Sequence, residues 1–335
     1  MFDKILVPLD GTERAAGILP YVSLLANGIN TRLVILSVVD HDSLGVSSAP
    51  TQEASDPALP MAFTGFIPVK PQARASSPDV EGSISQVMDR VGSRVRVDLD
   101  IVANQLRSQG INAEADVVFG EAAEKIVEVA KKKECDLIAM STHGRNTVSR
   151  AFLGSVTDKV IRTAQTPTLA ITPEKAQQLG ADGVKVSSIL VPLDGSDLAE
   201  SVLPFVVELA KQMSLTVDLC RAVNMFNVYT PYSAGTLLHS NSKTIESEVE
   251  AEAKAYLAGV AENLRNQGLE ARCGVMRGVP ASAIIDVARA LPENLIVMAS
   301  HGRSGFRRLA LGSVTDSVIR SAGDPVLVIP STNGH

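Results

Sequence analysis

The chain repeats itself, and this repeat limits what it can fold into more than any other feature. Residues 5–11 read Ile-Leu-Val-Pro-Leu-Asp-Gly, and residues 189–195 carry the same heptapeptide without a change. Residues 137–172 match residues 295–330 at 20 of 36 positions. Self-similarity of this extent indicates two copies of one structural unit, and 335 residues is the length of roughly two domains.

The two copies differ in length before their matching ends. The second copy follows the first by 184 residues at the heptapeptide but by 158 at the later match, so the first copy holds 26 extra residues. The Ser-, Ala- and Pro-rich stretch 43–82 lacks clear periodicity and predicts a long surface loop there. Its apolar segment 61–67 is either a lid or docking patch, or part of a mobile excursion. We predict one domain over 1–174 and a second over 185–331.

Short apolar runs alternate with helical patterns in each copy. The predicted strands of the first copy are 4–9, 33–38, 113–119, 137–140 and 168–171, and those of the second are 188–193, 216–222, 270–276, 295–298 and 326–329. The predicted helices are 13–27, 86–109, 122–132 and 156–164, with 199–212, 246–267, 281–290 and 314–322 in the second copy. Strands that are apolar throughout are typical of a parallel sheet covered on both faces. The pattern predicts α/β architecture: two tandem doubly wound, Rossmann-like, parallel-sheet domains of five strands each.

A glycine-containing loop follows the fourth strand of each copy. In the first copy His143-Gly144-Arg145 precedes Gly154-Ser155-Val156, and nine residues separate the two glycines. The second copy has the same spacing, with His301-Gly302-Arg303 before Gly312-Ser313-Val314. A loop that leaves a parallel strand and ends at a helix N-terminus is suited to a phosphate, because glycines allow close approach and the first-turn N–H groups favour an anion. This pattern predicts a phosphate site in each copy.

The serines of this loop have a simpler alternative role. Ser155 and Ser313 are each followed three residues later by an aspartate, which is the spacing of a capping box. The serines could therefore only cap their helices. A cap does not explain the two glycines at a fixed interval or the repeated His-Gly-Arg, so we favour phosphate binding.

These motifs resemble the signature of the universal stress protein (UspA-type) family. The His-Gly-Arg…Gly-Ser-Val pattern and the Val-Pro-Leu-Asp-Gly that opens each copy both match it, in the family's order along the chain. The resemblance covers both copies apart from 43–82 and the tails. It implies an adenine nucleotide α-hydrolase-like fold, ATP as the ligand, and a role in stress response or signalling with little or no turnover.

The resemblance also assigns site residues in each copy. In the first copy it implies nucleotide contacts from Asp10, Val39, Ser141, His143, Gly144, Arg145, Gly154, Ser155 and Val156. In the second copy it implies them from Asp194, Val223, Ala299, His301, Gly302, Arg303, Gly312, Ser313 and Val314. The aspartates would line the cleft, and the backbone near Val39 and Val223 would face the adenine.

Both copies depart from the family pattern at one position. ATP-binding members carry a first glycine where this chain has Ser141 and Ala299. A hydroxymethyl or methyl group there would crowd the sugar and phosphates, so we expect weakened rather than abolished binding. The second copy also keeps Gly305 and the basic pair Arg307-Arg308, so we expect it to be the stronger site.

Composition excludes several other classes of protein. A net charge of −6 and a pI near 5.5 argue against nucleic-acid binding, which needs a basic face. The three cysteines form no CxxC pair, and the two in or beside apolar runs, Cys135 and Cys220, are expected to be buried hydrophobes. The sequence shows neither a signal-peptide pattern nor an apolar run of the ~20 residues that a membrane span needs, so we expect a soluble cytoplasmic protein.

The sequence leaves two alternative functions open and also predicts how the two copies assemble. An enzyme that hydrolyses ATP or phosphorylates itself could use Asp10 and Asp194 to hold Mg²⁺, but no general base is apparent and we assign no catalytic residue. A nucleotide-free interaction module could act through 43–82. The resemblance implies pairing of edge strands, so we expect 168–171 and 326–329 to pair within one chain as an intramolecular pseudo-dimer, with further homodimerisation possible.

Overall fold

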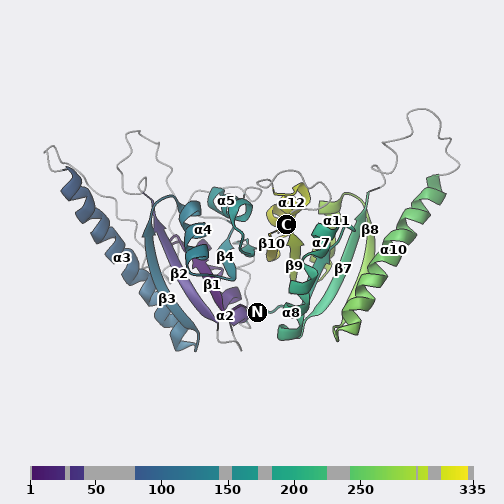
Figure 1. Cartoon of the computed structure of the whole chain (residues 1–335), viewed down its shortest axis with the longest axis horizontal. Coiled ribbons are helices and arrows are strands. Elements are labelled where there is room, and N and C mark those ends of the chain that lie inside the picture. The colour runs from purple at the N-terminus through teal and green to yellow at the C-terminus, as the bar shows by residue number, and fades with distance from the viewer. Residues whose placement is uncertain are drawn as a thin grey trace. The chain divides into compact units, whose positions relative to one another are not determined.

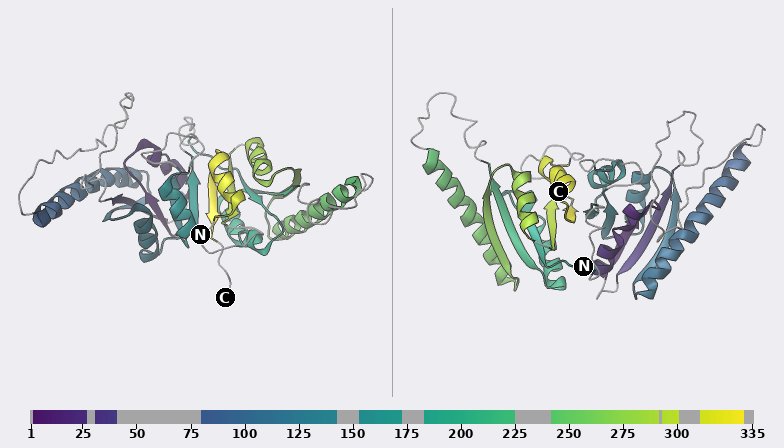
Figure 2. Two further views of the ribbon diagram at one scale, coloured as in Figure 1. Left: turned by 90° about the horizontal axis from the view of Figure 1, so that it is seen from above. Right: turned by 180° about the vertical axis from the view of Figure 1, so that it is seen from behind.

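The fold is described from a computed structural model of the chain, shown in Figures 1 and 2. The structure describes residues 2–26, 31–40, 80–142, 153–172, 183–224, 242–291, 293–300 and 311–330. It divides into two compact units, which we call the N-terminal unit (Phe2–Thr147 and Gly154–Val160) and the C-terminal unit (Val148–Leu153 and Ile161–His335, with Met1). Each unit is described by itself.

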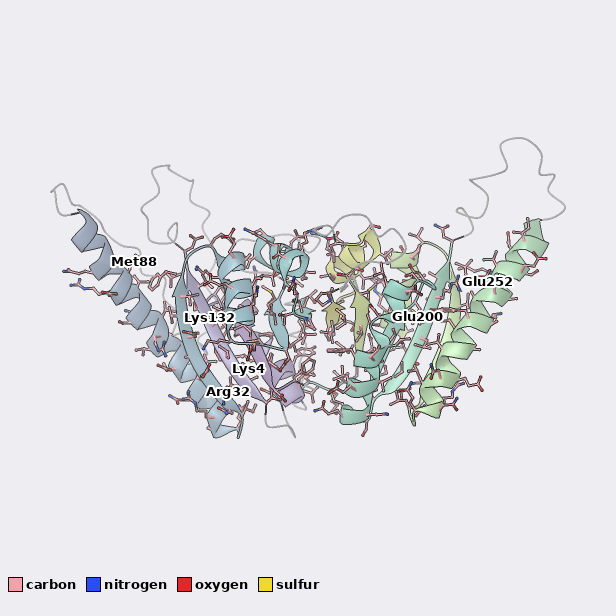
Figure 3. All side chains as sticks on the ribbon, viewed as in Figure 1. Lys4, Arg32, Met88, Lys132, Glu200 and Glu252 are labelled. Carbon is pink, nitrogen blue, oxygen red and sulfur yellow. The ribbon has the colours of Figure 1, made fainter. Side chains whose placement is uncertain are left out.

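The N-terminal unit holds four parallel strands. They are β1 (Lys4–Pro8), β2 (Arg32–Val39), β3 (Asn112–Phe119) and β4 (Leu137–Ser141). They lie in the order β3-β2-β1-β4. Lys4 and Arg32, both labelled in Figure 3, are register partners at the starts of β1 and β2. Chain order reverses between β1 and β4, which makes the carboxyl ends of these two strands the switch point of a doubly wound sheet.

The C-terminal unit repeats this order and adds two strands. It holds β5 (Thr168–Ile171), β6 (Ser188–Pro192), β7 (Thr216–Val223), β8 (Ala271–Arg277), β9 (Asn294–Ala299) and β10 (Val326–Ile329). The order is β5-β10-β9-β6-β7-β8, parallel throughout except that β5 and β10 pair antiparallel. The pairing of 168–171 with 326–329 that the sequence predicts is therefore confirmed, and the α/β fold class is as expected.

Helices connect the strands on the faces of each sheet. In the first copy they are α1 (Glu13–Ala16), α2 (Leu19–Ala26), α3 (Val80–Ser108), α4 (Ala122–Lys132) and α5 (Ser155–Thr163). In the second copy they are α7 (Asp197–Glu200), α8 (Leu203–Met213), α10 (Ser242–Asn266), α11 (Pro280–Ala290) and α12 (Ser313–Ser321). In Figure 1 the long helices α3 and α10 run along β3 and β8. Right-handed crossovers place α1–α3 on one face of their sheet and α4 and α5 on the other.

The prediction of single helices over 13–27 and 199–212 is wrong, because each is divided in two. α1 ends at Ala16 with Gly17 as its C-cap and α2 begins at Leu19, followed by Pro20, while α8 starts at Leu203 with Pro204 in its first turn. Proline has no N–H to donate and is tolerated in the first turn of a helix, so a new helix begins around it.

The third helix of the first copy is longer than the sequence pattern indicated. It begins at Val80 rather than at residue 86, so the last residues of the predicted 43–82 loop are helical. Residues 43–79, with the apolar segment 61–67, lie outside the described residues.

The strands form the centre of each core. Ile5, Leu6 and Val7 of β1 are fully buried, as are Ile189, Leu190 and Val191 of β6. Apolar side chains of successive residues point to opposite faces of a strand, so both faces must be covered. In the C-terminal unit, α11 and α12 cover one face with a single apolar cluster.

The three cysteines should differ sharply in reactivity. Burial raises the pKa of the Cys135 thiol to about 11 and that of Cys220 to about 12, whereas Cys273 is exposed. Because the thiolate is the reactive form, Cys135 and Cys220 stay protonated and shielded at pH 8. We expect one thiol per native chain to react rapidly with a disulfide reagent at pH 8, and three after denaturation. Rapid reaction of all three in folded protein would contradict this burial.

The β5–β10 pairing can be tested by a cross-strand disulfide. Leu169 and Leu327 are directly opposed register partners, and both are buried. Opposed residues of an antiparallel pair lie roughly 4.5–5.5 Å apart at Cα, which a disulfide can span. In a Cys273→Ser background, Leu169→Cys with Leu327→Cys should form an intramolecular disulfide on mild oxidation, visible as faster migration without reducing agent. Leu169→Cys by itself is the control, and exclusively intermolecular cross-linking would count against the pairing.

Candidate functional site

The candidate site of each copy lies where two neighbouring parallel strands end at the switch point. β1 and β4 pair in parallel with Ile5 opposite Leu137, which brings Asp10 and Ser141 to the same sheet edge. β6 and β9 pair with Ile189 opposite Leu295, which places the ends of those strands in the same way. Ligands of open α/β sheets bind outside the carboxyl ends of the strands at this point.

The turn after the first strand is built identically in both copies. Asp10 Oδ1 accepts hydrogen bonds from the Thr12 amide at 3.0 Å and the Thr12 hydroxyl at 2.6 Å. Thr12 Oγ1 in turn accepts the Ala15 N–H at 3.2 Å and caps α1. Gly11, between them, has φ of 85°, a left-handed conformation that favours glycine. Asp10 therefore orders this turn as well as facing the sheet edge.

The second copy has Asp194, Gly195 and Ser196 in these positions. The distances from Asp194 Oδ1 to Ser196 are again 3.0 Å and 2.6 Å, Gly195 has φ of 83°, and Ser196 caps α7. The Asp-Gly-Thr/Ser sequence is explained as one unit: a carboxylate that accepts, a glycine that turns and a hydroxyl that caps. Sequence reasoning missed the roles of Thr12 and Ser196, although a hydroxyl residue follows Asp-Gly in both copies.

Two hydrogen bonds fasten the start of the last helix to the end of the fourth strand. In the first copy the Gly154 N–H donates to the Thr142 carbonyl at 2.7 Å, and Thr157 Oγ1 donates to the Ser141 carbonyl at 2.9 Å. In the second copy the bonds are Gly312 N–H to Ser300 at 2.9 Å and Thr315 Oγ1 to Ala299 at 3.0 Å. Thr157 and Thr315 are buried. The sequence carried a signal for both threonines, which occupy the same place in the repeated Gly-Ser-Val-Thr-Asp.

The last helix of each copy starts with its first-turn amides directed to this sheet edge. The carbonyls of Gly154 and Gly312 accept the first intrahelical hydrogen bonds, from the backbone N–H groups of Asp158 and Asp316 at 2.9 Å each. Each glycine is therefore the N-cap residue. A glycine has no side chain with which to bond the first amides, and α12 has no side-chain cap. Helix N-termini leave such N–H groups without intrahelical acceptors, and the helix dipole favours an anion beside them.

The capping-box alternative is wrong for the second copy. Ser313 is the first helical residue rather than the N-cap. The Asp316 carboxylate accepts two bonds from Arg320, each of 2.9 Å, and lies 3.6 Å from Arg162. Ser155 likewise is the first residue of α5, and both serines are exposed. Val156 and Val314 follow them and are half-buried.

The two copies have different residues where ATP-binding family members carry the first glycine. Ser141 is 9% exposed, and its hydroxyl has no hydrogen-bond partner among the residues that the structure describes. A buried hydroxyl without a partner is costly, and a bound ligand would relieve that cost. Ala299, 6% exposed, offers a methyl group there.

The strand ends expected near the adenine are buried and partly engaged. The Val39 carbonyl accepts the Gly120 N–H at 3.1 Å, and the Val223 carbonyl accepts the Gly278 N–H at 3.0 Å. A carbonyl oxygen has two lone pairs, so each retains capacity for a further bond. The remaining predicted residues lie outside the described part of the chain, namely His143, Gly144, Arg145, His301, Gly302 and Arg303.

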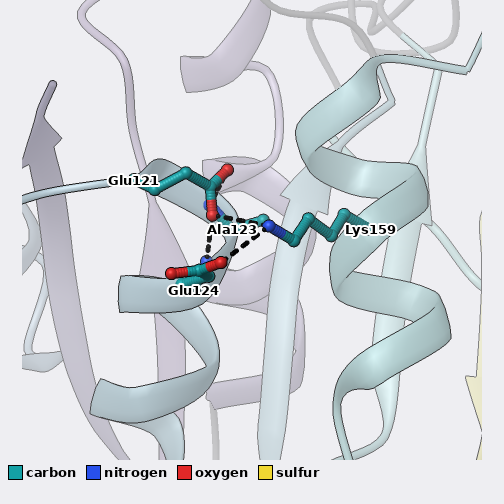
Figure 4. Close-up of polar contacts among 4 residues, drawn as sticks. All are labelled: Glu121, Ala123, Glu124 and Lys159. Atoms are coloured by element: carbon teal, nitrogen blue, oxygen red, sulfur yellow. Dashed lines mark hydrogen bonds and ion pairs between the residues drawn. The ribbon is translucent and has the colours of Figure 1, made fainter.

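The first copy has a charged link between two helices that the sequence did not reveal. Glu121 caps α4 through the Ala123 and Glu124 amides at 3.3 Å and 2.9 Å. Lys159 Nζ of α5 lies 3.0 Å from both Glu121 and Glu124, as Figure 4 shows. Partial burial raises the pKa of Glu121, but the backbone bonds and Lys159 outweigh this effect and leave that pKa lowered.

This link is specific to the first copy. The position equivalent to Glu121 is Val279, which caps α11 without a side-chain bond and is 57% exposed. A serine, Ser317, stands where the first copy has Lys159. Because neither residue recurs in the repeat, the link could not be found from the sequence. Its side chains are largely solvent-exposed, so it contributes little to stability.

The described residues contain neither a membrane-spanning helix nor a cluster of metal-ligating side chains. None of their helices is long and apolar enough to cross a membrane. Within the same part of the chain, no three or more His, Cys, Asp or Glu side chains gather as a metal site would require.

Fold and site together define a protein of two tandem doubly wound α/β units, each with an anion-receptive helix N-terminus at its switch point. The family model described as "Universal stress protein family" matches residues 1–172 and 185–330. The chain therefore belongs to the universal stress protein family.

Individual relatives agree with this assignment. Universal stress protein Mb2028c of Mycobacterium bovis is 25% identical over 220 residues, which is 65% of this chain and 69% of that protein. Universal stress protein MJ0577 of Methanocaldococcus jannaschii is 26% identical over 45% of this chain and 98% of its own length. The crystal structure of a universal stress protein from Archaeoglobus fulgidus is similar with a TM-score of 0.64 at 18% identity, covering 98% of this chain and 99% of that one, which supports the fold.

Removing the threonine hydroxyls should loosen the junction of strand and helix. Thr157→Val keeps the side-chain shape but leaves the Ser141 carbonyl without this donor, so we expect a loss of about 1–3 kcal/mol in the free energy of unfolding. Thr315→Val should act alike in the second copy. Urea denaturation provides the measurement. Ser155→Ala, at an exposed position, should stay within about 0.5 kcal/mol of wild type, and equal losses in both variants would contradict the role of Thr157.

Proposed function

We propose that the chain is an adenine-nucleotide-binding universal stress protein, with ATP as its ligand and a role in stress response or signalling rather than turnover. The observation that carries the proposal is the N-terminus of α5 and of α12, where glycine N-caps and first-turn amides meet the carboxyl edge of the sheet. Phosphates bind at helix N-termini because the amides and the dipole both favour them.

The surrounding residues fit a nucleotide. Ser155 and Ser313 expose their hydroxyls beside the first-turn amides, and the two-point attachment of each helix to its strand holds those amides in place. Preorganised donors bind an anion without further ordering cost. The Ser141 hydroxyl, buried and without a partner among the described residues, provides a donor at the same edge.

The two copies are proposed to differ in strength. The second copy lacks the hydroxyl of Ser141, because Ala299 has a methyl group there, but its sequence keeps Gly305 and two arginines in the following loop. We propose that the second copy is the stronger site, since guanidinium groups suit phosphate. Each copy would act as its own domain, 1–174 and 185–331, with β5 and β10 joining them as an intramolecular pseudo-dimer.

A carboxylate placed at the helix start should separate binding from folding. Ser155→Asp and Ser313→Asp each put a negative charge beside the first-turn amides, which suits the helix dipole but repels phosphate. Each variant should fold at least as stably as wild type, while the affinity of its copy for ATP should fall by about tenfold or more, which is ~1.4 kcal/mol. Calorimetric titration with ATP checks this, and the larger loss is expected for Ser313→Asp.

Ser317→Asp is the matched control. It introduces the same charge one turn later on α12, where the serine hydroxyl bonds the Ser313 carbonyl, and should leave ATP affinity close to wild type. The proposal fails if folded wild-type protein takes up no ATP, or if the double variant Ser155→Asp/Ser313→Asp binds ATP as wild type does.

A further inference from the structure

The N-terminal unit contains a cavity that the nucleotide proposal does not use. It has a volume of about 510 Å³ and lies between α1 and α2 on one side and the last turns of α3 on the other. Cavities of roughly 300–1,000 Å³ are typical of sites for small molecules. Neither Asp10 nor Val39, Ser141, Gly154 or Ser155 lines it, so it is a separate space from the candidate nucleotide site.

The walls of the cavity are mainly apolar. Leu9, Leu19, Val102 and Leu106 supply aliphatic side chains, and exposed Gln105 lies at the rim. Among the described residues that line it there is no lysine, arginine or histidine, and the single charged side chain is that of Glu13, which is exposed. An anionic ligand would find no counter-charge here, whereas an uncharged apolar molecule would gain from burial.

The second copy has a larger side chain at one position of the cavity wall. Ala16 lines the cavity, and its repeat equivalent is Glu200 of α7. Glu200 accepts a hydrogen bond of 2.7 Å from the Tyr256 hydroxyl of α10. Arg221 lies 5.1 Å from the centre of the Tyr256 ring. Figure 3 labels Glu200 and, on α10, Glu252, which lies 3.9 Å from Arg221.

The first copy has short side chains at the equivalents of this bridge. Asp98 stands in place of Tyr256, Ser37 in place of Arg221 and Ala16 in place of Glu200. The register of the comparison is secure, because Arg107 donates to the Ala113 carbonyl just as Arg265 donates to that of Ala271. The Glu200–Tyr256 hydrogen bond joins α7 to α10, whereas the methyl side chain of Ala16 cannot make the equivalent bond from α1 to Asp98 of α3.

We infer that this cavity of the N-terminal unit is a binding site for an uncharged, largely apolar small molecule. Gly11 and Thr12, which line the cavity, bring it next to the candidate nucleotide site at the carboxyl ends of β1 and β4. None of the lining residues is among those proposed to bind the phosphates. The inference does not depend on whether ATP binds.

Neighbouring residues of α3 provide a matched test. Val102 lines the cavity and is buried, whereas Ile101 is 61% exposed and does not line it. The full-length protein is titrated with the neutral fluorescent probe N-phenyl-1-naphthylamine. Wild type and Ile101→Phe should bind one probe saturably with dissociation constants within about twofold of each other, because the control leaves the site unchanged. Val102→Phe, which fills the cavity, should weaken binding by about tenfold or more.

A second filling variant covers the case in which Val102→Phe does not fold. Ala16→Leu fills the cavity from the opposite wall, and leucine has a high helix propensity, so α1 should still form. This variant should also weaken probe binding. The inference is overturned by an absence of saturable binding to wild type, or by a folded filling variant that binds as wild type does. Complete competitive displacement of the probe by ATP would overturn it as well, because the cavity would then belong to the nucleotide site.

Discussion

The hydrogen bonds between the end of the fourth strand and the start of the last helix are the interactions on which the candidate site depends. A helix N-terminus attracts anions only if its amides are held where a ligand can reach them. In both copies a glycine amide and a threonine hydroxyl hold the helix start to the carbonyls of two successive residues at the strand end, with distances of 2.7–3.0 Å. The loop between these anchors can then vary, as it does between the copies, without moving the amides.

The repeat made the fold predictable from the sequence. Apolar runs that are buried on both faces have few alternatives to a covered parallel sheet, and two matching copies had to give two matching strand orders. The pairing of Thr168–Ile171 with Val326–Ile329 was predicted from the family resemblance, which implies pairing of edge strands, and it agrees with the need of an exposed edge for a partner. At the site, the glycine spacing identified the start of the helix, although Ser155 and Ser313 are its first residues and not its caps.

Local geometry and single-copy contacts could not be predicted. The helices break after Ala16 and Glu200, where a glycine or a serine is followed closely by a proline. The apolar periodicity continues across each break, so it predicted one helix instead of two. The Lys159 link to Glu121 joins residues 38 apart in sequence, and charges of this kind on a helix usually stay solvated. Burial of Thr157 is visible only once helix and strand are placed together.

The two copies keep the site architecture and diverge beside it. Asp10 and Asp194 make the same bonds, yet the neighbouring helices are bridged by Glu200 and Tyr256 in one copy and by no equivalent side chains in the other. A tandem chain can keep one copy of this architecture as it is and allow the other to acquire a new neighbour. Gly11 and Thr12 line the cavity, so a molecule bound in it would contact the turn that Asp10 orders. A molecule bound there that shifts this turn would alter the nucleotide edge of the first copy only, and so give the tandem chain two sites with different responses.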